Sequence, residues 1–240
     1  MTPCLLITPG IVAYEKALRL QEALVAARRR GDIPDVLLLL EHPPVVTIGR
    51  GGGDGGLLLS REELLERGIQ VHESSRGGKV TYHGPGQLVG YPVLELSAHG
   101  RDLNRYLRRL ECALIAAMRW FDVYAFRRRG LTGVWASRGK IAAIGIAVRH
   151  WITSHGFALN VSCDLAPFDL IDPCGLGGMA VTSMTRERGR ELPFDAVQEE
   201  VAARLAEEFG FELRLCPSVP ITDDVAVAHV LNHIAAVRCS

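Results

Sequence analysis

The stretch "RGGKVTYHGPGQLVGYPV", residues 76–93, joins a polar, glycine-rich segment to a largely apolar run from Leu88 to Val93. It contains five glycines and two prolines among few large side chains. Glycine adopts positive φ freely and leaves room for another group to approach the main chain. We therefore expect this segment to enter a strand and either to hold a ligand against its backbone or to make a sharp turn.

Helical and strand-like periodicities alternate on both sides of this stretch. Apolar residues recur every three or four positions over 13–30, which predicts an amphipathic helix that Gly31 ends. Ser60 and Glu63 form a capping box for a short helix over 60–68. The remaining helices are expected over 102–120 and 194–209, and strands over 35–42, 43–49, 69–74, 133–136, 140–148, 156–161 and 211–215. This mixture predicts an α/β (α+β) fold, a mixed β-sheet flanked by helices.

Length and composition are those of a globular chain with one large domain or two small ones. The chain has 240 residues, 48% of them hydrophobic, which is ample for a buried core. The first break in composition comes near residue 217, so we expect a catalytic domain over 1–216 and a C-terminal extension over 217–240. No run of about 18 apolar residues and no signal peptide is recognisable, which predicts a cytoplasmic protein.

Charge gives little indication of a partner. Lys+Arg and Asp+Glu are equal at 27 each, so no net charge draws the chain to nucleic acid or to an anionic membrane. Two basic runs stand out, "ARRRG" at 27–31 and "FRRRG" at 126–130. Each is either a solvated helix end or loop, or a patch for an acidic partner, and the runs alone do not decide between the two.

One of the six cysteines lies in an unusual context. Without any C-x-x-C pair, all six are expected to be free thiols in a cytosolic chain. Cys174, in "IDPCGLGGMAVTSM" (171–184), follows a proline and precedes three glycines, so a substrate could approach its backbone closely. A thiol with a pKa of about 8.5 is only a few per cent thiolate at neutral pH, so a nucleophilic cysteine requires a neighbouring cation or base. A purely structural thiol is the alternative.

A lysine could supply that cation. Lys140 is one of only three lysines and begins the apolar strand "GKIAAIGIAV" (139–148). An unpaired ammonium there would be costly unless it points into a cleft, and a strand-end lysine that reaches water is equally compatible with the pattern.

Metal and nucleotide sites find little support in the sequence. Neither a phosphate-binding loop nor a G-x-G-x-x-G that opens a helix is present. His229 and His233 are one helical turn apart, but no third ligand is evident, so an ordinary helix surface is favoured. We predict no metal and no cofactor.

Five blocks of sequence together resemble one enzyme family. They are "EHPPVVTIG" (41–49), "RGGKVTYHGPGQLVGYPV" (76–93), "GVWASRGKIAAIG" (133–145), "HGFALNV" (155–161) and "PCGLGGMAVTSM" (173–184). In this order they are similar to the signature blocks of the lipoyl(octanoyl) transferases, the octanoyl-ACP:protein N-octanoyltransferases. The resemblance implies the catalytic fold of the biotin and lipoate protein ligases. The glycine run "RGGGDGG" (50–56) and the tail after Pro217 lie outside the blocks.

The resemblance also implies an activity and a site. An octanoyl group would move from octanoyl-acyl carrier protein to a lysine of lipoyl domains, in 2-oxoacid dehydrogenase complexes and in the glycine cleavage H protein, through a thioester on the enzyme. Cys174 matches the family's nucleophile, Lys140 matches its partner lysine, and His42 matches a position near the site. The substrate-binding positions fall on Arg76, Gly77, Gly78, Lys79, Val80, Thr81, Tyr82, His83, Ala143, Ile144, Gly145, Gly156, Phe157 and Ala158. On this view the glycines of 76–93 form the wall of an acyl slot, but which side chain closes the slot cannot be predicted.

Three alternatives have distinct consequences. A lipoate ligase would activate the free acid with ATP and would need no cysteine. A cysteine hydrolase or thioesterase would end its second step with water and would not depend on an acceptor domain. A non-catalytic acyl-binding protein would form no covalent adduct.

Overall fold

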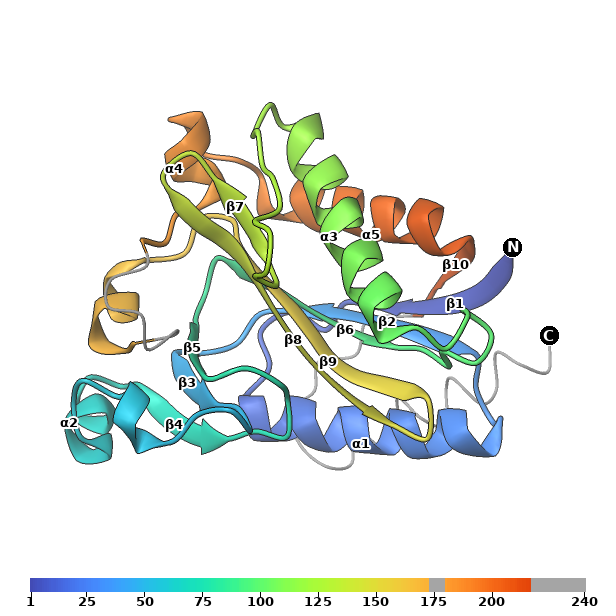
Figure 1. The fold of residues 1–240 in the computed structure, drawn as a ribbon, viewed down its shortest axis with the longest axis horizontal. Helices are drawn as coiled ribbons and strands as arrows, with labels where there is room; N and C mark the ends of the chain where they lie inside the picture. The colour runs from blue at the N-terminus through green and yellow to red at the C-terminus, as the bar shows by residue number, and fades with distance from the viewer. Residues whose placement is uncertain (173–179, 217–240) are drawn as a thin grey trace.

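The computed structural model describes residues 1–172 and 180–216. A large β-sheet runs through the centre of the molecule, with helices on both of its faces, and a small sheet lies to one side (Figure 1). The α/β prediction is therefore confirmed. The C-terminal extension lies outside the described residues, so the boundary near residue 217 stays a prediction.

The large sheet has seven strands in the described part of the chain, in the order β10-β1-β2-β6-β9-β8-β7. β1 pairs in parallel with β10 and β2, and every later neighbour along the sheet is antiparallel. The strands are β10 (Phe211–Leu215), β1 (Thr2–Ile7), β2 (Asp35–Leu40), β6 (Gln87–Val93), β9 (Ile152–Asn160), β8 (Gly139–Arg149) and β7 (Val134–Ala136).

Helices cover the two faces unequally. On one face α3 (Leu103–Trp120) packs against α5 (Phe194–Phe209), and on the other α1 (Tyr14–Arg30) lies across β6 and β9 (Figure 1). Leu20 and Leu24 of α1 are fully buried, and each such leucine stabilises the fold by about 1.5–3 kcal/mol. Both faces of β2 are covered, which explains its uninterrupted leucines.

The small sheet has the order β4-β3-β5 and is built from β4 (Gln70–Glu73), β3 (Val45–Ile48) and β5 (Val80–His83). Its core contains Leu64 of α2 (Arg61–Glu66) and Phe168 of the 3₁₀ helix η2 (Ala166–Leu170). A second 3₁₀ helix, η1 (Asp54–Gly56), lies in the glycine run, and α4 (Met184–Arg188) precedes α5.

The stretch 76–93 belongs to both sheets. Its first half forms β5 of the small sheet and its second half forms β6 of the large sheet. Between them, Gly86 has a φ of 81° and donates its N–H to the carboxylate of Glu41 at 2.6 Å. A Cβ at Gly86 would lie 2.7 Å from the backbone nitrogen of Cys163, so only glycine fits this turn. The stretch thus fixes how the two sheets meet.

Most predicted elements are confirmed, with differences at the ends. α1, α3 and α5 begin and end within one residue of their predicted limits, and the Ser60–Glu63 capping box is present. β9 starts four residues earlier than predicted, at Ile152 rather than Gly156. β1, β5 and α4 were not predicted. β5 has four residues and α4 only five, which is too short for a clear period.

Candidate functional site

A pocket of about 460 Å³ opens where the two sheets meet, beside the outer edge of β8. β7 pairs with β8 only as far as Ala142, and within residues 1–172 and 180–216 no other strand pairs with the rest of that edge. Instead, the loop before β5 crosses this edge, and Gly77 donates its N–H to the carbonyl of Ile146 at 2.8 Å. The pocket therefore has β8 and β9 as one wall and the loop 76–80 as another.

Part of the wall made by β8 and β9 consists of small residues. Ala143 is paired with Ala158, and Gly145 with Gly156, across the two strands. A Cβ at Gly145 would lie 2.8 Å from the carbonyl oxygen of Gly77, so the loop rests directly on the strand there. Such a close approach of two backbones requires glycine and leaves a narrow space beside it.

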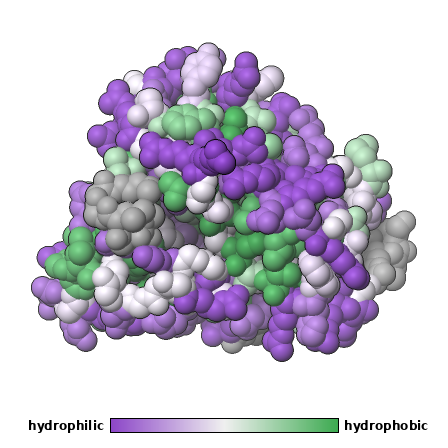
Figure 2. Space-filling model, viewed as in Figure 1, coloured by the Kyte–Doolittle hydropathy of each residue, from purple (hydrophilic) through white to green (hydrophobic). Residues whose placement is uncertain are grey.

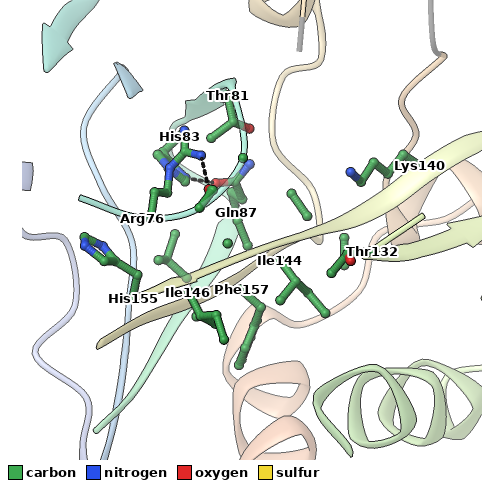
Figure 3. A pocket seen from close by; sticks show the side chains of 18 of the residues that line it. Arg76, Thr81, His83, Gln87, Thr132, Lys140, Ile144, Ile146, His155 and Phe157 are labelled. Carbon is green, nitrogen blue, oxygen red and sulfur yellow. Dashed lines mark hydrogen bonds between the residues drawn. The ribbon is translucent and has the colours of Figure 1, made fainter. Parts of the chain in front are cut away.

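Lys140 lies at one end of the pocket. In Figure 3 its ammonium group points into the pocket near Thr132, while Arg76 and His155 lie at the opposite end and Ile144 between them. The Lys140 nitrogen is 5.3 Å from the centre of the Trp135 ring, a cation–π distance. A Cβ at Gly133 would lie 2.8 Å from Cε of Lys140, so this glycine makes room for the lysine side chain.

The backbone of Lys140 holds the segment 180–182 in place. Its N–H donates to the carbonyl of Ala180 at 2.8 Å, and its carbonyl accepts from Thr182 N–H at 3.0 Å. Glu187 fixes the same segment from outside, because its carboxylate accepts from the Thr182 hydroxyl at 2.8 Å and from the Ser137 hydroxyl at 2.6 Å. Partial burial acts to raise the pKa of Glu187, but the hydrogen bonds from Ser137, Thr182 and Arg138 outweigh it and hold that pKa below its ordinary value.

Cys174 itself lies outside the described residues, so its position remains a prediction. The described residues on either side of it are anchored. Asp172 donates its N–H to the carbonyl of Gly56 at 2.8 Å, and Ala180 is held by Lys140 as above. The glycine run 50–56 thus contacts the chain two residues before Cys174, a connection that the sequence blocks did not indicate.

Arg76 forms the opposite end of the pocket with its guanidinium buried. It donates to the carbonyl of Thr47 at 2.6 Å and to the carbonyl of Gly77 at 3.0 Å. Burial lowers the pKa of Arg76, and no carboxylate lies within ion-pair distance of it in residues 1–172 and 180–216. A buried positive charge therefore faces the pocket without a described counter-ion.

A chain of buried polar side chains connects the pocket wall to the segment 180–182. His83 donates from Nδ1 to Gln87 at 2.7 Å, and Gln87 donates to Asn160 at 2.8 Å (Figure 3). Asn160 in turn donates to the carbonyl of Thr182 at 3.0 Å. Burial, with smaller contributions from His42 and Arg76, lowers the pKa of His83 well below its ordinary value, so this histidine is neutral at physiological pH.

Most of the predicted substrate-binding positions meet at this pocket. Two of the sequence candidates do not line it: Tyr82 packs its ring against Phe168, and His42 is fully buried, where it accepts from the Tyr91 hydroxyl at 2.7 Å. Burial lowers the pKa of His42 to about 4 and raises that of Tyr82 to about 12. The positions that do line the pocket are Lys140, Arg76, Gly77, Gly78, Lys79, Val80, Thr81, His83, Ala143, Ile144, Gly145, Gly156, Phe157 and Ala158.

Sequence analysis missed several residues that line the pocket. His155 is the first residue of the block "HGFALNV" and Asn160 the last but one. Isolated polar residues in an otherwise apolar strand could have indicated both as pocket residues. Leu131 and Thr132, in contrast, come from an irregular connection whose position no local pattern indicates.

Within the described residues no group of three or more His, Cys, Asp or Glu side chains could hold a metal ion. None of the helices in the same residues combines the length and the hydropathy needed to cross a bilayer. The free state of Cys4, Cys112, Cys163 and Cys216 agrees with the expected absence of disulfides at those positions.

Solved structures confirm the predicted type of fold. A lipoate-protein ligase A bound with ATP superimposes with a TM-score of 0.76 over 97% of this chain and 95% of its own, at 17% identity. A biotin protein ligase from Aquifex aeolicus gives a TM-score of 0.52 over 87% of this chain and 69% of its own, at 12% identity. At such identities the likeness concerns the fold alone.

Sequence comparison is more specific. Residues 13–206 match the lipoyl protein ligase A/B catalytic domain. An octanoyltransferase from Geobacter metallireducens is 52% identical over 195 residues, which is 81% of this chain and 88% of that protein. One from Rubrobacter xylanophilus is 49% identical over 204 residues, 84% and 91% of the two chains. A family match across most of the chain, relatives about half identical to it and a shared fold together establish that this protein belongs to the octanoyltransferases, acyltransferases of lipoate biosynthesis.

Proposed function

We propose that this octanoyltransferase takes its octanoyl group from octanoyl-acyl carrier protein and passes it through a thioester on Cys174 to a lysine of lipoyl domains. An acyl donor and a lipoyl-domain acceptor follow from the family in general. The acceptors would be the lipoyl domains of 2-oxoacid dehydrogenase complexes and the glycine cleavage H protein. The substrate positions would be those gathered at the pocket, with Lys140 as the partner of the nucleophile.

The observation that best supports this proposal is the position of Lys140. Its ammonium points into a pocket walled by Ala143, Gly145, Gly156 and Ala158, and its backbone pairs with residues 180–182, which follow Cys174 closely in the sequence. A cation so placed favours the thiolate form of a nearby cysteine.

The proposed reaction has two steps that balance. The Cys174 thiolate attacks the thioester carbonyl, the bond to the pantetheine sulfur breaks, and the Lys140 ammonium gives its proton to the departing thiolate. The amine of the acceptor lysine then attacks the enzyme thioester, its proton passes to the now neutral Lys140, and the Cys174 thiolate leaves. Exchange between thioesters is nearly balanced in free energy, so no ATP is required, and amide formation makes the second step favourable.

The pocket suits an alkyl chain. Apolar and small side chains line the wall between Lys140 and Arg76, among them Val89 and Ile144. Removing an octanoyl tail from water at roughly 0.8 kcal/mol per CH₂ contributes on the order of 5 kcal/mol, enough to prefer it over a two-carbon chain by orders of magnitude.

Incubation with octanoyl-acyl carrier protein, without an acceptor, tests the proposal directly. Intact-mass spectrometry should show the addition of one octanoyl group, and peptide mapping should locate it on Cys174. In Cys174→Ser the adduct should be absent and transfer should fall by roughly three orders of magnitude or more, since a hydroxyl without a strong base is a poor nucleophile. Cys163→Ser is a matched control, because burial raises the pKa of Cys163 to about 12 and leaves it an unreactive thiol.

The other outcomes point to the rival functions. An adduct on another cysteine, or full turnover by Cys174→Ser, would contradict the assignment of the nucleophile. Exchange of pyrophosphate into ATP driven by free octanoate would indicate a ligase. Release of octanoate at the same rate with and without a lipoyl domain would indicate a hydrolase.

A further inference from the structure

The connection between α3 and β7 exposes an arginine run. We call residues 124–132 of this connection the arginine loop. Arg127, Arg128 and Arg129 are exposed, and two large aromatic side chains precede them, Tyr124 at 77% exposure and Phe126 at 47%. Arginine beside exposed aromatic residues is a composition enriched at protein–protein interfaces.

The arginine loop borders the pocket. Phe126 and Trp135 exchange two backbone hydrogen bonds, of 2.7 and 2.9 Å, which attach the loop to the outer side of β7. Leu131 and Thr132 contribute to the pocket wall. The guanidinium of Arg128 lies 5.6 Å from the centre of the Trp135 ring, the same ring that lies 5.3 Å from the Lys140 nitrogen. The positive charges are thus next to the end of the pocket where Lys140 lies.

Arg127 and Arg129 form no ion pair within the described residues, a state they share with other surface arginines such as Arg29. In contrast, Arg28, Arg61 and Arg204 each pair with two carboxylates. In Figure 2 hydrophilic side chains gather across the middle of this face, above a hydrophobic patch, in the region where Figure 1 places the α3–β7 connection and β8. Two exposed arginines without a carboxylate partner among the described residues thus lie in a loop that borders the pocket.

We infer that the arginine loop is the docking surface for the acidic carrier protein that delivers the octanoyl thioester. This inference rests on the proposed function. The donor stays covalently attached to its carrier while the acyl chain enters the pocket, so the carrier's surface must lie at the pocket mouth during the first step. Unpaired arginines there attract an acidic surface, raise the rate of encounter and orient the carrier without adding to the chemistry. The exposed aromatic residues supply the apolar contact that the charges alone lack.

Charge reversal tests the inference. Arg127→Glu/Arg129→Glu should raise the KM for octanoyl-acyl carrier protein by about tenfold with kcat unchanged, because it replaces attraction at the interface by repulsion. The KM for octanoyl-pantetheine, a donor with no protein body, and the KM for the lipoyl domain should stay as in the wild type. Added salt should raise the wild-type KM for the carrier and affect the variant much less.

Arg29→Glu serves as the matched control. Arg29 belongs to the other arginine run, is also exposed and lies at the end of α1. The substitution Arg29→Glu should leave the KM values for octanoyl-acyl carrier protein, octanoyl-pantetheine and the lipoyl domain unchanged.

Each contrary result overturns the inference. Equal rises in KM for octanoyl-pantetheine and for the carrier would indicate a distorted pocket, and a rise for the lipoyl domain alone would assign the loop to the acceptor. Unchanged KM values would remove the loop from docking altogether. If instead the wild type fails to use octanoyl-acyl carrier protein at all, the proposed donor is wrong, which is a distinguishable result.

Discussion

The two cations of the pocket are held in opposite ways. Arg76 is buried, and its guanidinium is fixed by hydrogen bonds to Thr47 and Gly77. Lys140 is half-buried, and its ammonium lies beside the Trp135 ring. Its backbone forms hydrogen bonds with the segment 180–182. Hydrogen bonds thus fix the guanidinium of Arg76, and hydrogen bonds to residues 180–182 fix the main chain of Lys140.

This difference suggests a division of roles. A guanidinium stays charged in proteins and, held by several acceptors, provides a rigid end wall and a constant electrostatic field. An ammonium on a flexible stem can exchange protons and partners during a reaction. Lys140 is therefore suited to proton transfer and Arg76 to holding the pocket wall in place. Substitutions at the two positions can separate these roles.

The largest expected effect is that of Lys140→Met, which keeps much of the apolar side chain and removes the charge. Transfer should fall by roughly 10²–10⁴-fold, the usual contribution of a positioned acid–base group. The pKa of the Cys174 thiol should rise, seen as slower alkylation by iodoacetamide at neutral pH, with about 1.4 kcal/mol lost per pKa unit. The melting temperature should change little. Unchanged alkylation kinetics would argue against electrostatic pairing of the two residues.

Arg76→Lys is the counterpart and should show the reverse. A lysine cannot reproduce the several hydrogen bonds to the Thr47 carbonyl, the Thr47 hydroxyl and the Gly77 carbonyl. We expect a loss of roughly 1–3 kcal/mol in the free energy of unfolding, measured by urea titration, because buried carbonyls lose their donors. The alkylation rate of Cys174 should be unaffected. Slower alkylation here would mean that the two cations act together.

The sequence alone predicted the secondary structure well and the candidate site in part. The apolar residues at every third or fourth position over 13–30 and the Ser60–Glu63 capping box depend only on residues close in sequence, and both predictions are confirmed. The blocks shared with the family gave Lys140, Gly145 and Gly156 as site positions; all three line the pocket, and their roles stay a prediction. The geometric reason, that Gly145 lies under the carbonyl of Gly77 and Gly156 under the carbonyl of Gly90, depends on strand register and was beyond the sequence.

What could not be predicted depends on contacts between distant segments. Nothing near Glu187 in the sequence indicates that its carboxylate joins Ser137 to Thr182 across the chain. Each arginine run has three consecutive arginines, yet Arg28 of the first pairs with Asp35 and Glu95 and Arg30 with Asp32, while no arginine of the second has an ion pair among the described residues. Only the fold separates a solvated helix end from a patch beside a pocket.

A smaller effect concerns three buried histidines around Arg76. Burial lowers the pKa of His42 and of His155 to about 4, and that of His83 well below its ordinary value of 6.5, with Arg76 as a further cause for His83 and His155. The unfolded chain protonates them near 6.5, so between pH 6.5 and about 4 it binds more protons than the folded protein. Stability should be complete above this window and fall as the pH drops through it, by up to about 1.4 kcal/mol per pH unit per histidine.

Urea unfolding at several pH values between 7 and 4 measures this slope. In His155→Asn one titrating group is removed, and asparagine tolerates the positive φ of 54° at this position. The dependence of the unfolding free energy on pH should weaken by about the contribution of one histidine. A slope identical to that of the wild type would mean that His155 is protonated in the folded protein, and that Arg76 does not face a set of neutral histidines.

The smallest expected effects separate two adjacent glycines at the Arg76 end of the pocket. Gly78 has a φ of 84°, a conformation that costs other residues about 1–2 kcal/mol, whereas Gly77 is not in this region and the nearest atom to a Cβ there is the carbonyl oxygen of Ile146, at 3.4 Å. Gly78→Ala should therefore lower the free energy of unfolding by that amount with little change in KM for the octanoyl donor. Gly77→Ala should keep its stability and raise this KM several-fold, because a methyl group in a filled slot costs roughly 1 kcal/mol or more of binding. Melting curves and steady-state kinetics on the same preparations distinguish the two effects. If Gly77→Ala loses stability and keeps its KM, the loop 76–80 has a structural role at this point and does not contact the acyl chain.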